Sequence, residues 1–245
     1  MIADDETLDP ILRGKARILQ KKSGYRFSMD ALLLSHFAQV QKKARVMDLG
    51  TGVGIIAILI AKKDPTAIVT GIEIQRELCD CAKKNVVLND LTDRVRIFQL
   101  AVQEASGVFP AQSFDLVIAN PPYRKMNSGR PNPDQQKMQA RHEVLGKLED
   151  FLGASSHLLG RGGRADFIVR AARLSECVTL MSRLELEPRR LRLVHPTAEK
   201  DAHLALVEGV KQGRSELTVL PPLCIHRSDG LYADEVAGIL EGACL

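Results

Sequence analysis

The chain has 245 residues, 45% of them hydrophobic, which is enough for a sizeable core in one large domain or two small ones. Its formal net charge of +4 does not by itself identify a nucleic-acid-binding protein. The start Asp4-Asp5-Glu6 is unlike the cationic start of a signal peptide, and no apolar stretch reaches the ~20 residues of a membrane span, so we expect a soluble, cytoplasmic protein.

The five cysteines form no C-x-x-C pair and match no histidine spacing, which predicts neither a disulfide framework nor a zinc site. We therefore expect a reducing compartment and no bound metal. The six histidines are scattered and none pairs with a nucleophile, so no catalytic histidine is expected. No linker, low-complexity tract or repeat interrupts the chain, and we expect residues 1–245 to form a single domain.

Residues 1–44 form a basic lead-in segment within this domain. Six cations lie in it before the first predicted strand, with no acid among them: Arg13, Lys15, Arg17, Lys21, Lys22 and Arg26. Such a cluster is a candidate surface for phosphates, although it is also compatible with an ordinary solvated face.

The next stretch, Val46–Gly54, predicts a short strand that runs into a glycine turn, and the apolar run Ile55–Ala61 predicts a buried helix after it. Glycines at 50, 52 and 54 do not match a dinucleotide fingerprint, whose third glycine would fall at Ile55, so NAD is disfavoured. A G-x-G-x-G turn preceded by an acid lets the backbone approach an adenosyl ligand with an amino-acid tail. Asp48 can meet the ammonium of that tail through water or a neighbouring amide.

The second predicted strand, Ala67–Glu73, ends in a carboxylate about twenty residues beyond the glycines, where nucleotide-binding α/β folds hold ribose hydroxyls. Glu73 is therefore the predicted ribose ligand. An isolated acid here would as readily be a solvated strand end, but the glycine turn before it favours the binding role.

The strand predicted at 114–119 ends in Asn120-Pro121-Pro122-Tyr123, which we interpret as a site for a planar nitrogen. An adenine amine or a carboxamide nitrogen is a poor nucleophile because its lone pair is delocalised. The Asn120 side-chain oxygen and the Pro121 carbonyl can each accept an N–H bond, which directs the lone pair at an electrophile. Pro121 and Pro122 stiffen the loop, and Tyr123 offers a ring on which a flipped base stacks. Alone, the tetrapeptide would equally suit a plain loop.

Cations are also in excess after this motif. Arg124, Lys125, Arg130, Lys137, Arg141 and Lys147 outnumber Asp134 and Glu143. In a doubly wound fold this loop lies at the carboxyl edge of the sheet, beside the ligand crevice, so the cations are expected to rim the site and hold phosphates; the alternative is an ordinary solvated surface. Residues 129–133 are rich in glycine and proline and are interpreted as a mobile loop that closes over the substrate base.

Strand-like runs alternate with helix-like runs, which predicts an α/β fold with a doubly wound parallel sheet. The predicted strands are near 45–49, 68–73, 94–100, 114–119, 163–169, 189–195 and 202–210. The last two follow one another so closely that a hairpin is expected.

Together, the glycine turn, Glu73 and the Asn-Pro-Pro-Tyr motif resemble the class I S-adenosylmethionine-dependent methyltransferases that act on amino groups. Nearly the whole chain is similar to the bacterial tRNA (adenine-N6)-methyltransferase family that modifies the adenine beside the valine tRNA anticodon. The stretch 24–34 is similar to that family's short lead-in helix, and 220–235 to its C-terminal tail. The resemblance implies a Rossmann-like, seven-stranded, mostly parallel sheet whose last strand is antiparallel.

The resemblance also implies roles for individual residues. Asn120, Pro121, Pro122 and Tyr123 form the catalytic set. The expected ligands of S-adenosyl-L-methionine, and of the product S-adenosyl-L-homocysteine, are Asp48, Gly50, Thr51, Gly52, Gly54, Glu73, Ile74, Ala101, Val102, Asn120 and Asp30. The RNA, with tRNA as the favoured substrate, is expected to contact Tyr123, Arg124, Lys125 and Arg130.

One departure from that family lies in the strand at 94–100. Members commonly have an acid at its end that binds the adenine amine of the cofactor, but here the end provides none. Gln99, the backbone of Ala101 and Val102, or Glu104 would have to take its place.

Three alternatives stay open on the sequence alone. One is a protein glutamine-N5 methyltransferase, whose carboxamide substrate has the same delocalised lone pair. Such enzymes have a longer helical domain before the glycine turn, whereas only some 45 residues precede the turn here. A DNA adenine methyltransferase would need an added recognition domain. A noncatalytic module that binds S-adenosylmethionine or RNA is the third. The sequence does not decide between a monomer and a dimer.

Overall fold

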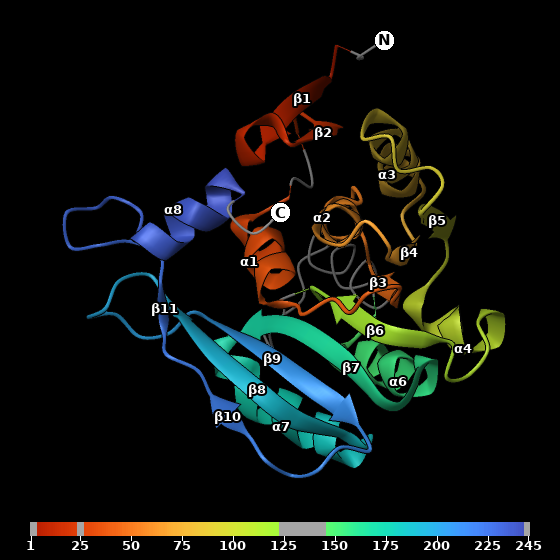
Figure 1. Ribbon diagram of the computed structural model, residues 1–245, viewed down its shortest axis with the longest axis vertical. Coiled ribbons are helices and arrows are strands. Elements are labelled where there is room, and N and C mark those ends of the chain that lie inside the picture. Colours follow the sequence, from red (N-terminus) through yellow and green to blue (C-terminus); the bar gives the residue numbers. More distant parts are fainter. Residues whose placement is uncertain (1–3, 24–26, 123–145, 243–245) are drawn as a thin grey trace, which may run out of the picture.

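The computed structural model describes residues 4–23, 27–122 and 146–242, and its centre is a mixed sheet of nine strands (Figure 1). The strand order is β10-β8-β9-β7-β6-β3-β4-β5, and β11 pairs with β8 outside this path. The strands are β3 (Arg45–Leu49), β4 (Ile68–Glu73), β5 (Val95–Gln99), β6 (Phe114–Ala119), β7 (Leu159–Arg170), β8 (Leu186–His195), β9 (Leu204–Lys211), β10 (Thr218–Val219) and β11 (Leu223–Cys224).

The middle of the sheet is parallel, as predicted. Asp48 of β3 lies opposite Gly71 of β4 on one side and Ile118 of β6 on the other. β3 is buried from Val46 to Leu49 because the sheet is covered on both faces, which is why the strand is apolar on successive positions instead of alternating. The carboxyl ends of β3, β4 and β6 therefore meet at one edge.

The predicted C-terminal hairpin is present, and its reversed last strand is confirmed. β9 pairs antiparallel with both β8 and β7, so it lies between them. Within this part of the sheet Asp166 of β7 lies opposite Glu208 of β9, which in turn lies opposite Arg190 of β8. The Arg190 Nη1 and Glu208 Oε2 atoms form an ion pair at 2.9 Å.

Asp166 is fully buried, and neither of its carboxyl oxygens has a hydrogen-bond partner among the described residues. Burial, with the adjacent Glu208 carboxylate as a smaller cause, raises the pKa of Asp166 to about 7. Arg164, Arg190 and Lys63 oppose that shift.

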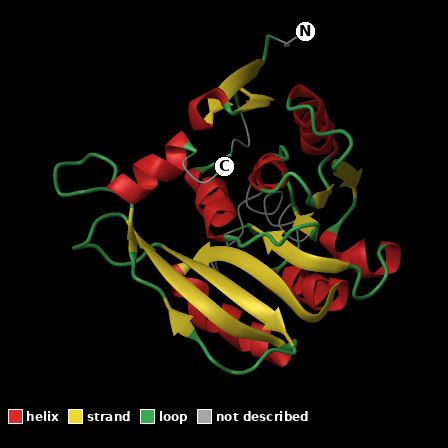
Figure 2. Cartoon of the chain, in the orientation of Figure 1, coloured by secondary structure: helices red, strands yellow, loops and turns green. Residues whose placement is uncertain are grey.

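Helices cover the sheet in two layers (Figures 1 and 2). α1, α2 and α3 lie on one face, and α6 and α7 lie on the other, in agreement with the two separate apolar clusters of the core. The α-helices of the described residues are α1 (Met29–Phe37), α2 (Ile55–Lys63), α3 (Arg76–Leu88), α4 (Ala105–Val108), α6 (Leu148–Leu158), α7 (Leu174–Arg183) and α8 (Asp234–Glu241). Within those residues, no helix is both long enough and apolar enough to cross a membrane.

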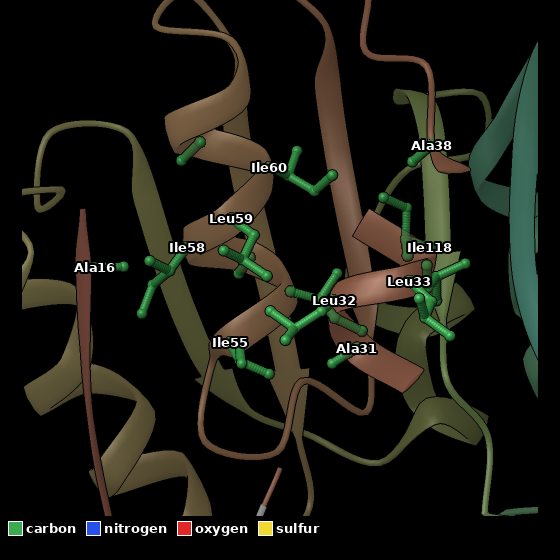
Figure 3. Packing of buried hydrophobic residues seen from close by; sticks show 14 of the residues in the cluster. Ala16, Ala31, Leu32, Leu33, Ala38, Ile55, Ile58, Leu59, Ile60 and Ile118 are labelled. Atoms are coloured by element: carbon green, nitrogen blue, oxygen red, sulfur yellow. The ribbon is translucent and has the colours of Figure 1, made fainter. Parts of the chain in front are cut away.

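α2 is the central helix of one cluster. Its residues 55–61 are all buried, because α1, α3, β2 (Ala16–Lys21) and the sheet surround it. In Figure 3, Ile58 points toward Ala16 of β2, while the side chains of α1 lie between α2 and Ile118 of the sheet. A helix with apolar residues on all sides is stable only when buried in this way.

The lead-in segment differs from its prediction. Residues 6–21 form a hairpin of β1 (Glu6–Ile11) and β2, joined by the 3₁₀ turn η1 (Leu12–Gly14). Several of its cations are paired: Lys21 with Asp5 at 2.5 Å and Arg13 with Glu241 of α8 at 2.6 Å. The positive charge of this segment is therefore partly neutralised by acids that lie outside the stretch 13–26.

Asn85 of α3 joins this hairpin to the rest of the molecule. Its buried side chain accepts a bond from the Leu19 amide at 2.7 Å and donates to the Leu19 carbonyl at 2.8 Å. It also donates to the carbonyl of Val53, in the glycine turn, at 2.9 Å. A single amide thus connects β2, α3 and the loop after β3.

Candidate active site at the carboxyl edge of the sheet

The glycine turn between β3 and α2 has a left-handed backbone. Gly50, Gly52 and Gly54 have φ angles of +70°, +59° and +85°, a region that favours glycine. A Cβ atom on Gly54 would lie 3.1 Å from the Cβ of Ala82 in α3. The Thr51 amide donates to the Ile72 carbonyl of β4 at 2.9 Å, which fixes the turn against the neighbouring strand.

Asp48 is buried under this turn. Its Oδ2 atom accepts bonds from the Thr51 hydroxyl and, at 3.2 Å, from the Ala57 amide in the first turn of α2. Its Oδ1 atom has no hydrogen-bond partner among the described residues. Burial raises the pKa of Asp48 to about 7, against the opposing effect of these two bonds. The Asp48 carboxyl therefore joins the glycine turn to the N-terminus of α2, and the Thr51 hydroxyl is one of its two hydrogen-bond donors.

Glu73 ends β4 with its carboxylate held by the backbone. Oε2 accepts from the Gly52 amide at 3.0 Å, and Oε1 accepts from the Gln75 amide at 2.9 Å. Burial raises the pKa of Glu73, and the bonds from Gln75 and Gly52 oppose the shift. Two backbone donors leave further lone pairs on a carboxylate, so the group can accept additional hydroxyl donors.

These elements surround a pocket of about 260 Å³ at the carboxyl edge. Its lining is Gly50, Gly52, Ile72, Glu73, Ile74, Gln75, Leu78, Leu100, Val102, Asn120, Pro122 and Phe151. The structure thus brings together seven of the predicted site residues from four separate segments of the chain. The sequence analysis missed Ile72, Gln75, Leu78, Leu100 and Phe151.

Most of the missed residues carried a readable signal. Ile72 is adjacent to Glu73, and Gln75 and Leu78 follow it within a helical turn of α3. Phe151 is different: it comes from α6, and its ring lies 3.3 Å from where a Cβ on Gly50 would be. Nothing in the sequence near Phe151 connects it to the glycine turn.

Asn120 follows the last residue of β6, and its side chain lines the pocket. Its Oδ1 atom is buried and has no hydrogen-bond partner among the described residues. An orphaned buried acceptor is costly unless a ligand satisfies it, so this atom marks a place for an N–H donor. Pro121 is buried beside it.

The other predicted residues lie as follows. Thr51, Gly54 and Asp48 support the turn from outside the pocket lining, and Asp30 lies in the first turn of α1, also outside it. The Ala101 amide donates to the Glu104 carboxylate at 3.2 Å, so this pair is bonded internally. Tyr123, Arg124, Lys125, Arg130 and the predicted mobile loop at 129–133 lie outside the described residues.

No cluster of three or more His, Cys, Asp or Glu side chains in the described part of the chain could hold a metal ion. The described lining of the pocket offers hydrogen-bond acceptors, backbone amides and apolar walls.

The sheet order, the glycine turn and the pocket beyond β3, β4 and β6 define a class I, Rossmann-like methyltransferase. A solved structure with this fold, a predicted O-methyltransferase, protein Atu636 from Agrobacterium tumefaciens, superposes with a TM-score of 0.71 at 24% identity, covering 87% of this chain and 96% of the other. The methyltransferase small domain family matches residues 28–169, and the chain belongs to this family.

Relatives similar over most of the chain have a more specific name. A tRNA1(Val) (adenine(37)-N6)-methyltransferase of Porphyromonas gingivalis is 31% identical over 226 residues, which cover 88% of this chain and 87% of the relative. The protein of the same name in Vibrio campbellii is 28% identical over 214 residues, which cover 87% of this chain and 86% of the relative.

Proposed function

We propose that this chain is an S-adenosylmethionine-dependent methyltransferase that transfers a methyl group to the N6 amine of an adenine in RNA, with tRNA as the favoured substrate. The observation that carries the proposal is the buried, unpartnered Oδ1 of Asn120 in the wall of the nucleotide-type pocket, among the described residues. The similar proteins of P. gingivalis and V. campbellii support tRNA as the substrate class.

The pocket suits the proposed cofactor. The Glu73 carboxylate retains lone pairs for the two ribose hydroxyls, and Gly50 and Gly52 allow close approach of the backbone. Ile74, Leu78, Leu100 and Val102 supply apolar contacts for a purine. When bound, S-adenosylmethionine supplies a methyl group attached to a sulfonium sulfur. The thioether that leaves when this methyl group is transferred is a good leaving group.

In the proposed reaction Asn120 and Pro121 prepare the nucleophile. The Asn120 Oδ1 atom and the Pro121 carbonyl each accept one N–H bond from the adenine amine, which favours a tetrahedral nitrogen with its lone pair toward the methyl group. Both oxygens also stabilise the positive charge that develops on the nitrogen during transfer. A strong base is not required, because the amine loses its proton only after it has become cationic.

The remaining predicted contacts form part of the proposal. Tyr123 stacks on the flipped base, and Arg124, Lys125 and Arg130 contact phosphates, which makes binding fall with salt. The sequence position of Tyr123, Arg124 and Lys125 directly after Pro122, a residue of the pocket wall, supports this assignment. Residues 1–245 are proposed to act as one domain in the cytoplasm.

The experiment that tests the function uses purified protein, unmodified bulk tRNA and S-adenosylmethionine with a labelled methyl group. The tRNA is digested and its labelled nucleosides are identified by mass spectrometry. We expect labelled N6-methyladenosine, absent when the protein is omitted. Cofactor binding without labelled N6-methyladenosine in the tRNA would contradict the assignment to a tRNA adenine.

A further inference from the structure

The pocket has two chemically different ends. The strand order β6-β3-β4-β5 places Asn120, after β6, at one end, and Glu73, at the end of β4, nearer the other. On the β5 side of Glu73 the lining residues Ile74, Leu78, Leu100 and Val102 are all apolar, and we call them the apolar sleeve. If the cofactor assigned above binds with its ribose at Glu73, its methyl group must face Asn120 and its purine must enter the sleeve. The inference below therefore rests on the proposed function.

Polar groups next to the sleeve are already bonded within the protein. The Leu100 amide donates to the Glu73 carbonyl at 3.1 Å, and the Ala101 amide donates to the Glu104 carboxylate at 3.2 Å. The Gln99 side-chain amide donates to the Ile74 carbonyl at 3.4 Å. Each of these bonds occupies an N–H donor that could otherwise reach a base edge, and the exposed Gln99 and Glu104 side chains lie outside the pocket lining.

Gln75 is the one polar side chain of the described lining near the sleeve, and it belongs to the ribose end. Its backbone amide donates to Glu73 Oε1, and its side chain also hydrogen-bonds to that carboxylate. The four residues of the apolar sleeve themselves carry no polar side-chain atom. Among the described lining residues, Glu73 supplies the one carboxylate, and it is assigned to the ribose.

The sleeve is also open to the surface. Leu78 and Leu100 are half-buried, so a 6-substituent at this end can reach water. A site that hydrogen-bonds a polar substituent rejects an analogue without it strongly, because a buried protein partner loses its bond. A site made of apolar walls and water discriminates little between purines with different 6-substituents.

We propose that this protein recognises the purine of its cofactor through apolar contacts alone and does not read the 6-position. The pocket therefore accepts purine nucleoside cofactors with a 6-oxo or an N6-alkyl group nearly as well as the adenosyl compound. The chemical class is a purine-5′-thioether or sulfonium nucleoside with an amino-acid tail.

Binding measurements on the full chain test this without any methyl transfer. Isothermal titration calorimetry would compare S-adenosyl-L-homocysteine, its 6-oxo analogue S-inosyl-L-homocysteine and its N6-methyl analogue. We expect the three dissociation constants to agree within about threefold. A loss of about thirtyfold or more for the 6-oxo compound would overturn the proposal, because it would require a specific acceptor for the adenine amine.

A pair of variants places the purine at the sleeve. Leu100→Asp introduces a carboxylate that accepts from a 6-amine and repels a 6-oxo group, so it should create a preference of about tenfold for the adenosyl compound. Leu100→Asn is the matched control: its amide can serve either purine, and we expect it to leave the ratio near that of the unmodified protein. Thermal melts of both variants, compared at one pH, would report folding.

The outcomes separate this inference from the proposed function. If none of the three compounds binds, the cofactor assignment itself fails. If all bind and the 6-oxo compound is strongly rejected, the methyltransferase assignment stands and the apolar reading of the purine is wrong. If Leu100→Asp and Leu100→Asn give the same ratio of dissociation constants, the purine does not lie in the sleeve, and the inference is overturned.

Discussion

At the scale of single residues, Asn120 combines a place in the pocket lining with a buried Oδ1 atom that has no hydrogen-bond partner among the described residues. We predict that Asn120→Ala reduces methyl transfer to tRNA on the order of 10²–10³-fold, because an acceptor for the developing charge is lost. Binding of S-adenosyl-L-homocysteine should change by less than about threefold, since this contact is made mainly in the transition state. Single-turnover assays and calorimetry measure the two effects.

Gln99→Ala is the matched control for that prediction. Gln99 is also an amide residue at the end of a strand, but it is exposed and lies outside the pocket lining. Its substitution should leave transfer close to that of the unmodified protein. Equal transfer rates for Asn120→Ala and Gln99→Ala would remove Asn120 from the mechanism.

Asp166 gives a second prediction at this scale. Its pKa is about 7 in the folded protein against 3.8 for an ordinary aspartate, so the folded state keeps a proton that the unfolded state loses between these values. The contribution of Asp166 to the free energy of unfolding is therefore largest below about pH 4. It falls as the pH rises toward 7 and stays constant above pH 7, for a total loss of roughly 4 kcal/mol.

Asp166→Asn should remove this pH dependence, because an amide has the shape of the protonated acid and does not ionise. We expect the variant to be more stable than the unmodified protein at pH 8, and to have a clearly smaller advantage at pH 5, where only about 1–2 kcal/mol of the loss has occurred. Chemical denaturation at the two pH values measures the difference. An advantage of the same size at both pH values would show that Asp166 does not hold the extra proton.

At the scale of elements, the local sequence pattern was sufficient to predict those strands and helices whose own residues determine them. The glycine turn follows β3 as expected, since glycines at 50, 52 and 54 can adopt positive φ angles next to an apolar run. The β1–β2 hairpin was not predicted, because it is held by partners distant in sequence: Glu241 pairs with Arg13, and Asn85 hydrogen-bonds to the backbone of Leu19. A count of cations within residues 13–26 could not include those partners.

Asn85 supplies a test of how that hairpin is held. Asn85→Ala removes one acceptor and two donors at a buried position, leaving the Leu19 amide and carbonyl and the Val53 carbonyl without this partner. We predict a loss of about 2–4 kcal/mol in the free energy of unfolding. Urea denaturation measures it.

Val87→Ala provides the comparison, because Val87 lies on α3 close to Asn85 in sequence but is 61% exposed. This substitution should change the free energy of unfolding by less than about 1 kcal/mol. If both variants lose the same small amount, the hairpin is held by its apolar contacts and not by the Asn85 amide.

At the scale of the whole molecule, the pocket joins segments far apart in the chain. The glycine turn, Glu73 and Asn120 were predictable because each is a strand end with its own motif. Phe151 was not, because its place beside Gly50 depends on how α6 packs under the sheet, and no short pattern encodes that packing. For the same reason the sequence could not say that Asp48 supports the turn from below instead of lining the pocket.

Since the pocket connects so many segments, ligand binding should stabilise the whole fold. At a concentration a hundredfold above its dissociation constant, S-adenosyl-L-homocysteine should add about 2.7 kcal/mol, which corresponds to a rise of about 5–10 °C in the melting temperature. Glu73→Gln should lose most of this rise, since a neutral amide is a weaker acceptor for hydroxyl groups. Differential scanning fluorimetry measures both, and an unchanged rise in Glu73→Gln would exclude Glu73 as a ligand.

The position of β9 between β7 and β8 has a consequence for how the protein is made. All the lining residues of the pocket, from Gly50 to Phe151, leave the ribosome before β9 does. Until β9 emerges, β8 has no neighbour in the sheet, and β7, twelve residues long, is an open edge that can pair with another chain. The nascent protein therefore acquires its ligand-binding half first, and its greatest exposure to aggregation falls in the interval between the synthesis of β7 and that of β9.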